Sequence, residues 1–149
     1  MLFRSGRPTS FFYSSPSCGG EKCSQEILAL GTPLIWWSAV IALGVLVGFV
    51  VSRRDKRGAL ILLGVAAGYL PWFAFQQRTV FSFYSIVFEP FIILTLTYVI
   101  GLLQQRYKTY IYGFFIAVGL CFLYFLPIYI AQTMTYDDWH ARMWFSSWI

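Results

Sequence analysis

Four long apolar stretches dominate the chain, and short polar segments separate them. The stretches are Pro33–Val51, Gly58–Phe75, Thr79–Leu103 and Tyr110–Met134, of 19, 18, 25 and 25 residues, with Glu89 as their one charged residue. At a rise of about 1.5 Å per residue, even the shortest stretch spans roughly 27 Å, close to the hydrocarbon thickness of a bilayer. Because backbone groups in lipid must be hydrogen-bonded internally, the pattern predicts four transmembrane helices.

The overall composition supports a membrane protein over a soluble helical domain. Hydrophobic residues make up 58% of the 149 residues and charged residues only 11%, against about 45–50% and about 25% in soluble domains. The mean hydropathy is +0.65. So few charges could not cover a water-facing surface, which excludes a disordered chain and an ordinary cytosolic enzyme. We therefore expect an all-α membrane protein whose first partner is the lipid bilayer.

The basic residues predict how the spans are oriented. Six of the 11 Lys and Arg residues lie in two short connectors, Ser52–Arg57 and Gln104–Thr109. Lys and Arg gather in cytoplasmic loops, so these connectors are expected in the cytoplasm and both termini outside it. The same distribution argues against a nucleic-acid-binding patch, the other common meaning of a net charge of +5.

This topology divides the chain into three parts. Residues 1–32 are expected to form an extracytoplasmic loop segment, residues 33–134 a four-helix transmembrane module built as antiparallel hairpins, and residues 135–149 an extracytoplasmic interfacial tail rich in tryptophan. An extracytoplasmic N-terminus without an earlier span has two explanations. Either the helical hairpins insert unaided, or the chain is the C-terminal part of a longer membrane protein whose N-terminal transmembrane portion is missing, which we favour.

Two cysteines in the N-terminal segment are candidates for a disulfide. Cys18 and Cys23 lie five positions apart with Gly19 and Gly20 between them, and this spacing can close a small turn on the oxidising side of a membrane. Two free thiols or an incomplete zinc site remain as alternatives. Cys121 lies within the fourth apolar stretch, where a packing role is expected. We predict no metal site and no cofactor.

Arg78 is the first candidate for chemistry, because it lies in the three-residue connector between the second and third stretches. At the edge of a bilayer a guanidinium can make paired hydrogen bonds to a phosphate while it stays charged. Tyr69, Trp72, Phe81 and Tyr84 could line a groove beside it. The pattern is consistent with a clamp for a lipid-linked phosphate, and equally with an arginine that reaches ordinary head groups within an aromatic belt.

Two prolines are expected to shape the helices, and an intramembrane acid accompanies one of them. Pro71 should kink the second helix near its outer end. Glu89 and Pro90 fall in the middle of the third stretch, where a carboxylate is costly and usually functional. Two interpretations stay open for Glu89: a proton or cation site, or a protonated carboxyl bonded to the backbone that Pro90 breaks.

The polar start of the tail offers no catalytic arrangement. Asp137 and Asp138 could bind a divalent metal, but adjacent residues point in different directions, so helix capping is the favoured role. His140 has no serine, cysteine or carboxylate pattern that marks a triad. No residue is therefore assigned as catalytic.

Several segments together resemble the C-terminal part of the bacterial polyprenol-phosphate-mannose–protein mannosyltransferases. The segments that carry the resemblance are Gly6–Tyr13, the Cys18 and Cys23 loop, Leu30–Trp37, Gly68–Phe73, Arg78–Tyr84 and Arg142–Ile149. They occur in the family's order and cover the chain almost completely from Gly6 onward. Each segment alone is a weak signal, whereas their succession is fairly specific.

The resemblance implies a GT-C type fold, polyprenyl-phosphate-mannose as the donor, and Ser or Thr of exported proteins as acceptors. It also implies that the acidic residues that activate the acceptor lie in an early extracytoplasmic loop, to which nothing in this chain corresponds. We therefore expect a closing transmembrane module that is inactive alone, with Arg78 toward the donor phosphate. The alternatives are a small proton-coupled transporter that uses Glu89, and a non-catalytic membrane assembly partner.

Overall fold

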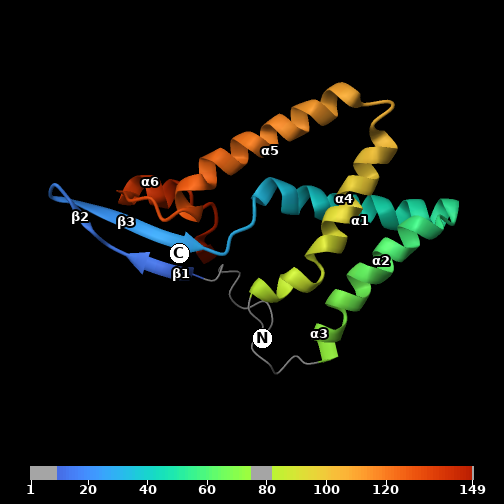
Figure 1. Ribbon diagram of the computed structural model, residues 1–149, viewed down its shortest axis with the longest axis horizontal. Coiled ribbons are helices and arrows are strands. Elements are labelled where there is room, and N and C mark those ends of the chain that lie inside the picture. Colours follow the sequence, from blue (N-terminus) through green and yellow to red (C-terminus); the bar gives the residue numbers. More distant parts are fainter. Residues whose placement is uncertain (1–9, 75–81, 149) are drawn as a thin grey trace.

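The computed structural model describes residues 10–74 and 82–148, and in these residues the chain is mostly helical (Figure 1). Three helical segments are long and apolar enough to cross a membrane. They are α1 (Pro33–Arg53), α2 (Lys56–Tyr69) together with α3 (Pro71–Ala74), and α5 (Lys108–Tyr129). The chain is thus a membrane protein, and its described residues contain three candidate spans of 19 to 22 residues.

The third predicted span differs from the expectation. The prediction of one helix over Thr79–Leu103 is wrong, because a 3₁₀ helix, η1 (Ser82–Val87), precedes a separate helix α4 (Glu89–Leu103) of 15 residues. Pro90 lies in the first turn of α4, where a residue without an amide hydrogen is tolerated. At about 1.5 Å per residue, α4 alone reaches roughly 22 Å, so a fourth span is not confirmed.

The second predicted span is interrupted by Pro71, as the sequence predicts. Helix α2 ends at Tyr69 and α3 begins at Pro71, so only Leu70 separates the two. Proline cannot donate the backbone hydrogen bond that a continuous helix would require at this position.

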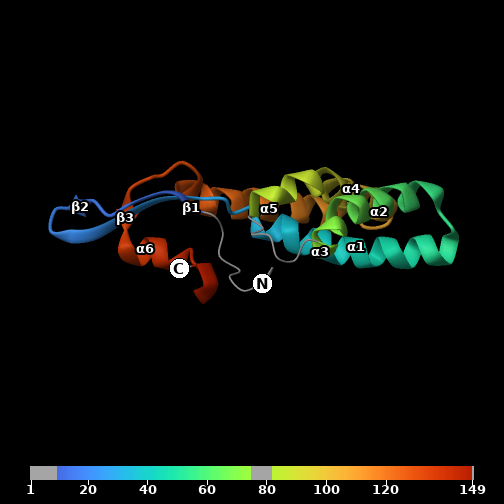
Figure 2. The same cartoon turned by 90° about the horizontal axis from the view of Figure 1, so that it is seen from below.

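Helices α1, α2 and α4 pack against one another as a three-helix body, in which α1 forms one layer and α2 with α4 the other (Figure 2). The contact is close because glycines of α2 face aromatic side chains. A Cβ atom at Gly68 would lie 2.8 Å from the Cβ atom of Phe88, and one at Gly64 would meet the ring of Phe91. Small residues at a four-residue spacing allow helices in membranes to approach in this way.

The N-terminal segment forms strands rather than the loop that was expected, so the chain is not all-α. Its strands are β1 (Ser10–Ser14), β2 (Ser17–Cys18) and β3 (Glu21–Leu28), and a short β4 (Met134–Thr135) comes from the other end of the chain. All pairings are antiparallel and all involve β3. Gly19 and Gly20 form the turn between β2 and β3 with φ angles of 63° and 102°, a conformation that glycine adopts without strain.

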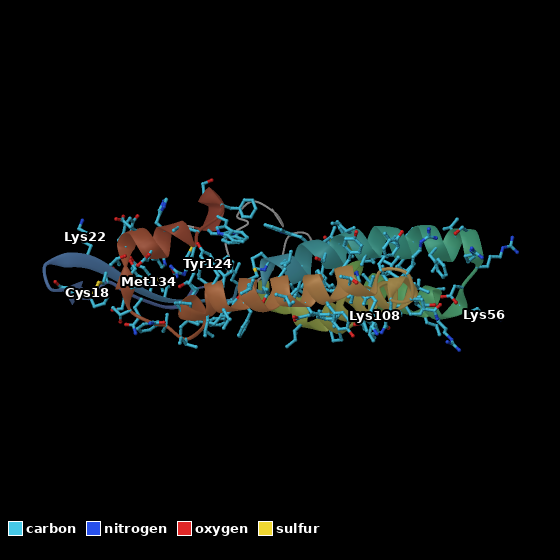
Figure 3. All side chains as sticks on the ribbon, turned by 90° about the horizontal axis from the view of Figure 1, so that it is seen from above. Cys18, Lys22, Lys56, Lys108, Tyr124 and Met134 are labelled. Carbon is cyan, nitrogen blue, oxygen red and sulfur yellow. A yellow bond between two sulfur atoms is a disulfide. The ribbon has the colours of Figure 1, made fainter. Side chains whose placement is uncertain are left out.

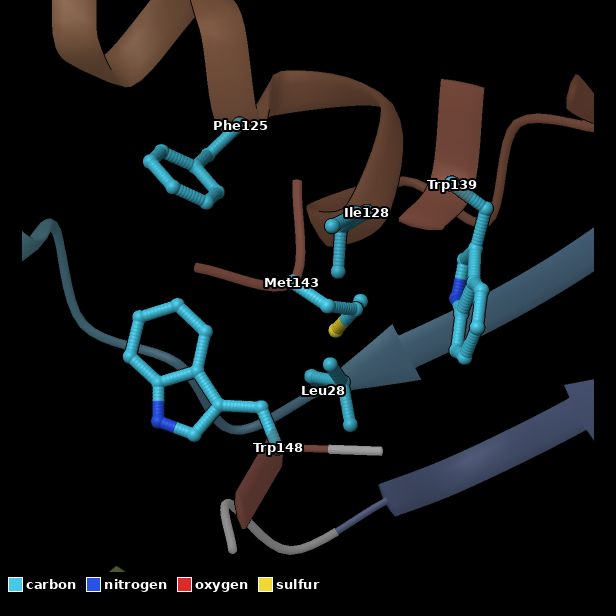
Figure 4. Packing of buried hydrophobic residues seen from close by; sticks show 6 residues of the cluster. All are labelled: Leu28, Phe125, Ile128, Trp139, Met143 and Trp148. Atoms are coloured by element: carbon cyan, nitrogen blue, oxygen red, sulfur yellow. The ribbon is translucent and has the colours of Figure 1, made fainter. Parts of the chain in front are cut away.

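The sheet holds the two ends of the chain together. After β4 the chain continues into α6 (Tyr136–Ala141) and a short 3₁₀ helix, η2 (Ser146–Trp148). The tail packs on β3 and on the last turns of α5, where Phe125 and Ile128 are 0% exposed. Figure 4 shows the buried cluster. Its members are Leu28, Phe125, Ile128, Trp139, Met143 and Trp148.

The sheet and the most basic connector lie at opposite ends of the molecule. Figure 3 shows Cys18 and Lys22 at one extreme of the long axis and Lys56, the first residue of α2, at the other. Such a separation is what the predicted topology requires, although the side of the membrane on which each end lies remains a prediction.

Candidate functional site

The structure describes only part of the predicted phosphate-binding group. Arg78 and Phe81 lie outside the described residues, and Tyr84 lies in η1 with its side chain outside the description. Tyr69 and Trp72 are described, and they flank the break between α2 and α3.

Tyr69 belongs to an aromatic cluster that connects the end of α2 to the start of α4. Its ring centroid lies 5.4 Å from that of Phe73 and 5.3 Å from that of Phe88, both in edge-on geometry. We call Tyr69, Phe73 and Phe88 the aromatic cluster. Trp72 lies next to it and donates from Nε1 to the carbonyl oxygen of Gly68 at 3.0 Å. These contacts order the aromatic side chains at the end of α2, which precedes in sequence the connector that holds Arg78.

Glu89 does not lie in the middle of a helix, as the sequence analysis placed it. It is the first residue of α4, and Pro90 follows in the same turn, so Pro90 breaks no backbone ladder to which a carboxyl could bond. The second interpretation of Glu89 is therefore wrong. A carboxylate in the first turn of a helix is stabilised by the partial positive charge of the free amide groups.

The Glu89 side chain lines a pocket of about 170 Å³ between the first turns of α1 and α4. The other lining residues come from Gly31–Ala39 and from Ile92 and Ile93. Among the described residues no hydrogen bond or ion pair engages its carboxylate. Sequence reasoning identified this acid but missed the pocket, because the uninterrupted apolar stretch gave no sign that a helix starts at this point.

A buried acid in the sheet also escaped the sequence analysis. Glu26 of β3 is 1% exposed, and its Oε2 accepts a hydrogen bond from Nε1 of Trp139 at 2.9 Å. Its Oε1 has no hydrogen-bond partner among the described residues. Ser24, Glu26 and Leu28 are buried along β3, but its sequence does not alternate between apolar and polar residues. The sequence therefore carries no signal that would reveal this acid.

The basic connector contains an acid that fixes its shape. Asp55 caps α2 by accepting from the backbone amide of Gly58 at 2.7 Å, and it accepts from the hydroxyl of Tyr98 on α4 at 2.6 Å. The hydrogen bond from Tyr98, followed by the one from Gly58, lowers the pKa of the Asp55 carboxyl below its ordinary value. The arrangement ties the connector to α4, with a structural rather than a chemical role.

The remaining candidates serve structure in the described part of the chain. Cys18 and Cys23 are joined through their sulfur atoms, with their Cα atoms 6.0 Å apart. Asp137 and Asp138 lie in the first turn of α6, whose cap is Thr135, and Thr135 donates to Oδ2 of Asp138 at 3.0 Å. The described residues hold no group of three His, Cys, Asp or Glu side chains that could bind a metal ion.

Three relatives with similar sequences share one name. The polyprenol-phosphate-mannose–protein mannosyltransferase of Mycolicibacterium smegmatis (strain ATCC 700084 / mc(2)155) is 32% identical, in an alignment that covers 89% of this chain and 28% of that protein. The protein of the same name from Mycobacterium tuberculosis (strain ATCC 25618 / H37Rv) is 29% identical, with 88% of this chain and 27% of that protein covered. The protein of this name from Corynebacterium glutamicum is 34% identical, with 97% of this chain and 30% of that protein covered.

These similarities cover almost all of this chain and only a part of each relative. No family profile and no solved structure matches the chain. The chain spans less than a third of the length of the relatives it matches. Over nearly its whole length, the protein is therefore homologous to one segment of the polyprenol-phosphate-mannose–protein mannosyltransferases.

Proposed function

We propose that this chain is the C-terminal membrane module of a protein O-mannosyltransferase, which transfers mannose from polyprenyl-phosphate-mannose to Ser or Thr of exported proteins. The observation that carries the proposal is the name shared by relatives that match 88–97% of the chain. The apolar helices fit a lipid-linked donor, because its polyprenyl tail must stay in the bilayer. The partners of the module are then the donor, the acceptor protein and the rest of the enzyme.

Within the module, Arg78 is proposed to bind the donor phosphate, with Tyr69, Trp72 and Tyr84 beside the lipid. The aromatic cluster supports this role, because it gives the end of α2 an ordered apolar wall immediately before the connector that contains Arg78. A guanidinium can stabilise the charge that develops on a phosphate as it leaves the sugar.

The module is proposed to lack the base that activates the acceptor hydroxyl. In the family that this chain resembles, the acidic residues for that step lie in an early extracytoplasmic loop, and none of the acids here can be matched to them. The 149-residue protein alone should therefore transfer no mannose to a Ser- or Thr-containing peptide. Transfer by the purified chain would contradict the modular assignment.

Donor binding is the direct test of the proposal. The chain in lipid nanodiscs should bind polyprenyl phosphate, and Arg78→Ala should weaken binding about tenfold or more, because a charged, paired hydrogen bond is lost. Arg106→Ala is the matched control, since it removes the same charge from the connector between α4 and α5. Equal binding by all three proteins would favour a non-catalytic assembly role instead.

We propose that both termini and the sheet lie outside the cytoplasm, and that the α1–α2 and α4–α5 connectors lie inside it. Single cysteines introduced as Ser52→Cys and Ser17→Cys, in a background without the natural cysteines, test it. A membrane-impermeant thiol reagent should label position 17 in intact cells, and position 52 only after permeabilisation. The reverse pattern would overturn this orientation.

A further inference from the structure

A small pocket lies where the first turns of α1 and α4 meet. Its volume is about 170 Å³, below the roughly 300 Å³ at which pockets for drug-sized ligands begin. Ala39 and Ile92, which are 0% and 7% exposed, contribute apolar lining, whereas Glu89 and Thr32 contribute polar atoms. We propose that this pocket receives the sugar of the lipid donor, with the Glu89 carboxylate accepting hydrogen bonds from its hydroxyl groups; the inference rests on the proposed function.

The charges around the pocket favour an uncharged ligand. Pro33 and Glu89 are the first residues of α1 and α4, so two helix N-termini adjoin the pocket. Each brings a partial positive charge of about half a unit, which offsets the negative charge that a carboxylate places in the pocket. The carboxylate in turn repels a phosphate. A neutral group with several hydroxyl donors satisfies both conditions, because a carboxylate accepts hydrogen bonds on both oxygens.

The remaining lining suits a sugar ring. Trp36 contributes an indole ring, and Gly31 leaves the space that this ring occupies, since a Cβ atom at position 31 would meet its Nε1 and Cδ1 atoms. The side chain of Thr32 makes no capping hydrogen bond to α1, although Thr32 is the cap residue. An aromatic wall beside a few polar groups is the usual composition of a pocket that orients a small ligand.

The pocket lies close to the aromatic cluster at the end of α2. Phe88, whose ring is 5.3 Å from that of Tyr69, directly precedes Glu89. Phe88 therefore belongs to the aromatic cluster, and the next residue, Glu89, lines the pocket. In a sugar phosphate a single oxygen joins the sugar to the phosphorus, so the two groups require neighbouring subsites.

The test compares two lipids, one that carries the sugar and one that lacks it. The chain in lipid nanodiscs is titrated with short-chain polyprenyl-phosphate-mannose and with the matching polyprenyl phosphate. Wild type should bind the mannosylated lipid about tenfold more tightly, the gain expected from hydrogen bonds to a charged acceptor. Glu89→Gln and Glu89→Ala should bring this preference to about twofold or less, and leave the affinity for polyprenyl phosphate unchanged.

Two controls separate this role from others. Asp137→Asn removes an exposed acid from the first turn of α6, away from the pocket, and should keep the full preference. Arg78→Ala should weaken both lipids equally and leave their ratio intact. Equal weakening of both lipids by the Glu89 variants would overturn the sugar assignment, because it would mean that Glu89 acts on the fold or on the phosphate.

The wild-type result separates the inference from the proposed function on which it rests. Binding of both lipids with equal affinity would overturn the sugar pocket and leave the phosphate-binding module standing. Binding of neither lipid would overturn both. A preference for mannose that survives both Glu89 substitutions would place the sugar at another part of the chain and also overturn the inference.

Discussion

The three-helix body and the sheet with its tail are stabilised in different ways. In the hydrophobic clusters of helices α1, α2 and α4 the buried side chains are all aliphatic, with Ala39 and Ala42 among them, and two glycines of α2 lie close against Phe88 and Phe91. The sheet region instead buries large side chains such as Phe125 and Trp139, and its β3 strand pairs with β4 from the far end of the chain as well as with nearby β1 and β2.

The difference follows from the solvent that each region is proposed to meet. In lipid, apolar side chains gain little by leaving the solvent, so close backbone approach must supply the packing energy. In water, burial of large aromatic surface is the main source of stability. The sheet region can therefore tolerate little truncation of its core, whereas the helical body can tolerate little enlargement.

The largest effect is expected from truncation in the sheet region. Phe125 is 0% exposed, and its ring centroid lies 4.9 Å from that of Trp144. Phe125→Ala should lower the free energy of unfolding of this region by about 3–5 kcal/mol. Hydrogen exchange should show faster exchange in β3 and α6 while α1 and α2 keep their protection. Phe115→Ala, at a ring that is 55% exposed on the same helix, should change neither.

Enlargement in the helical body should have the next largest effect. A Cβ atom at Gly68 would lie 2.8 Å from the Cβ and 3.2 Å from the Cα of Phe88, and a backbone atom cannot rotate away. Gly68→Val should therefore destabilise the body by about 3 kcal/mol. Gly48→Val is the matched control, because a Cβ atom there has no neighbour within 4 Å. The measurement is thermal unfolding in detergent. Equal losses of stability in both variants would contradict the proposed difference between the two regions.

The two regions also differ in how far the sequence could predict them. Length and apolarity alone predicted α1 and α5, because lipid allows few backbone conformations, although α5 ends at Tyr129 and not at the predicted Met134. The break after α2 was predicted from Pro71. The start of α4 could not be placed, since residues on both sides of Glu89 are equally apolar. Its pocket depends on which turns of α1 and α4 meet, and only the packing decides that.

The sheet was missed for two reasons: β3 shows no strand pattern in its sequence, and part of its contacts join distant parts of the chain. Glu26 and Trp139, which share a buried hydrogen bond, are 113 positions apart, and β3 pairs with β4 over a similar separation. The residues of β3 do not alternate between apolar and polar, so the local pattern does not predict a strand. The turn at Gly19 and Gly20 was visible, but a turn alone does not reveal which strands it joins.

A smaller effect is expected from the hydrogen bond that fixes the tail. Glu26→Ala leaves the indole Nε1 of Trp139 without its acceptor, which should cost about 1–2 kcal/mol and loosen α6 from the sheet. Glu26→Gln keeps an acceptor of the same shape and should retain most of the stability. Fluorescence of Trp139, in a background where the other tryptophans are phenylalanine, reports the change. A Gln variant as loose as the Ala variant would show that the charge, rather than the hydrogen bond, matters.

The smallest effect should be a pH dependence confined to the helical body. Hydrogen bonds from Tyr98 and then Gly58 lower the pKa of the Asp55 carboxyl below its ordinary value of 3.8. A carboxyl group whose pKa is lower in the folded protein contributes its full stabilisation at pH values above its pKa in the unfolded chain. This stabilisation is lost as the pH falls through its pKa in the folded protein. Between about pH 5 and about pH 2, wild type should therefore lose more stability than Asp55→Asn.

Tyr98→Phe isolates the principal cause of that shift. The variant keeps the Asp55 cap on α2 and removes the hydroxyl donor, so the pKa of Asp55 should return toward its ordinary value. Its unfolding midpoint should then depend on pH less than that of wild type, with hydrogen exchange in the sheet region unaltered by the substitution. If wild type, Asp55→Asn and Tyr98→Phe lost stability in parallel as the pH falls, the hydrogen bond between Tyr98 and Asp55 would not help to hold α4 in place.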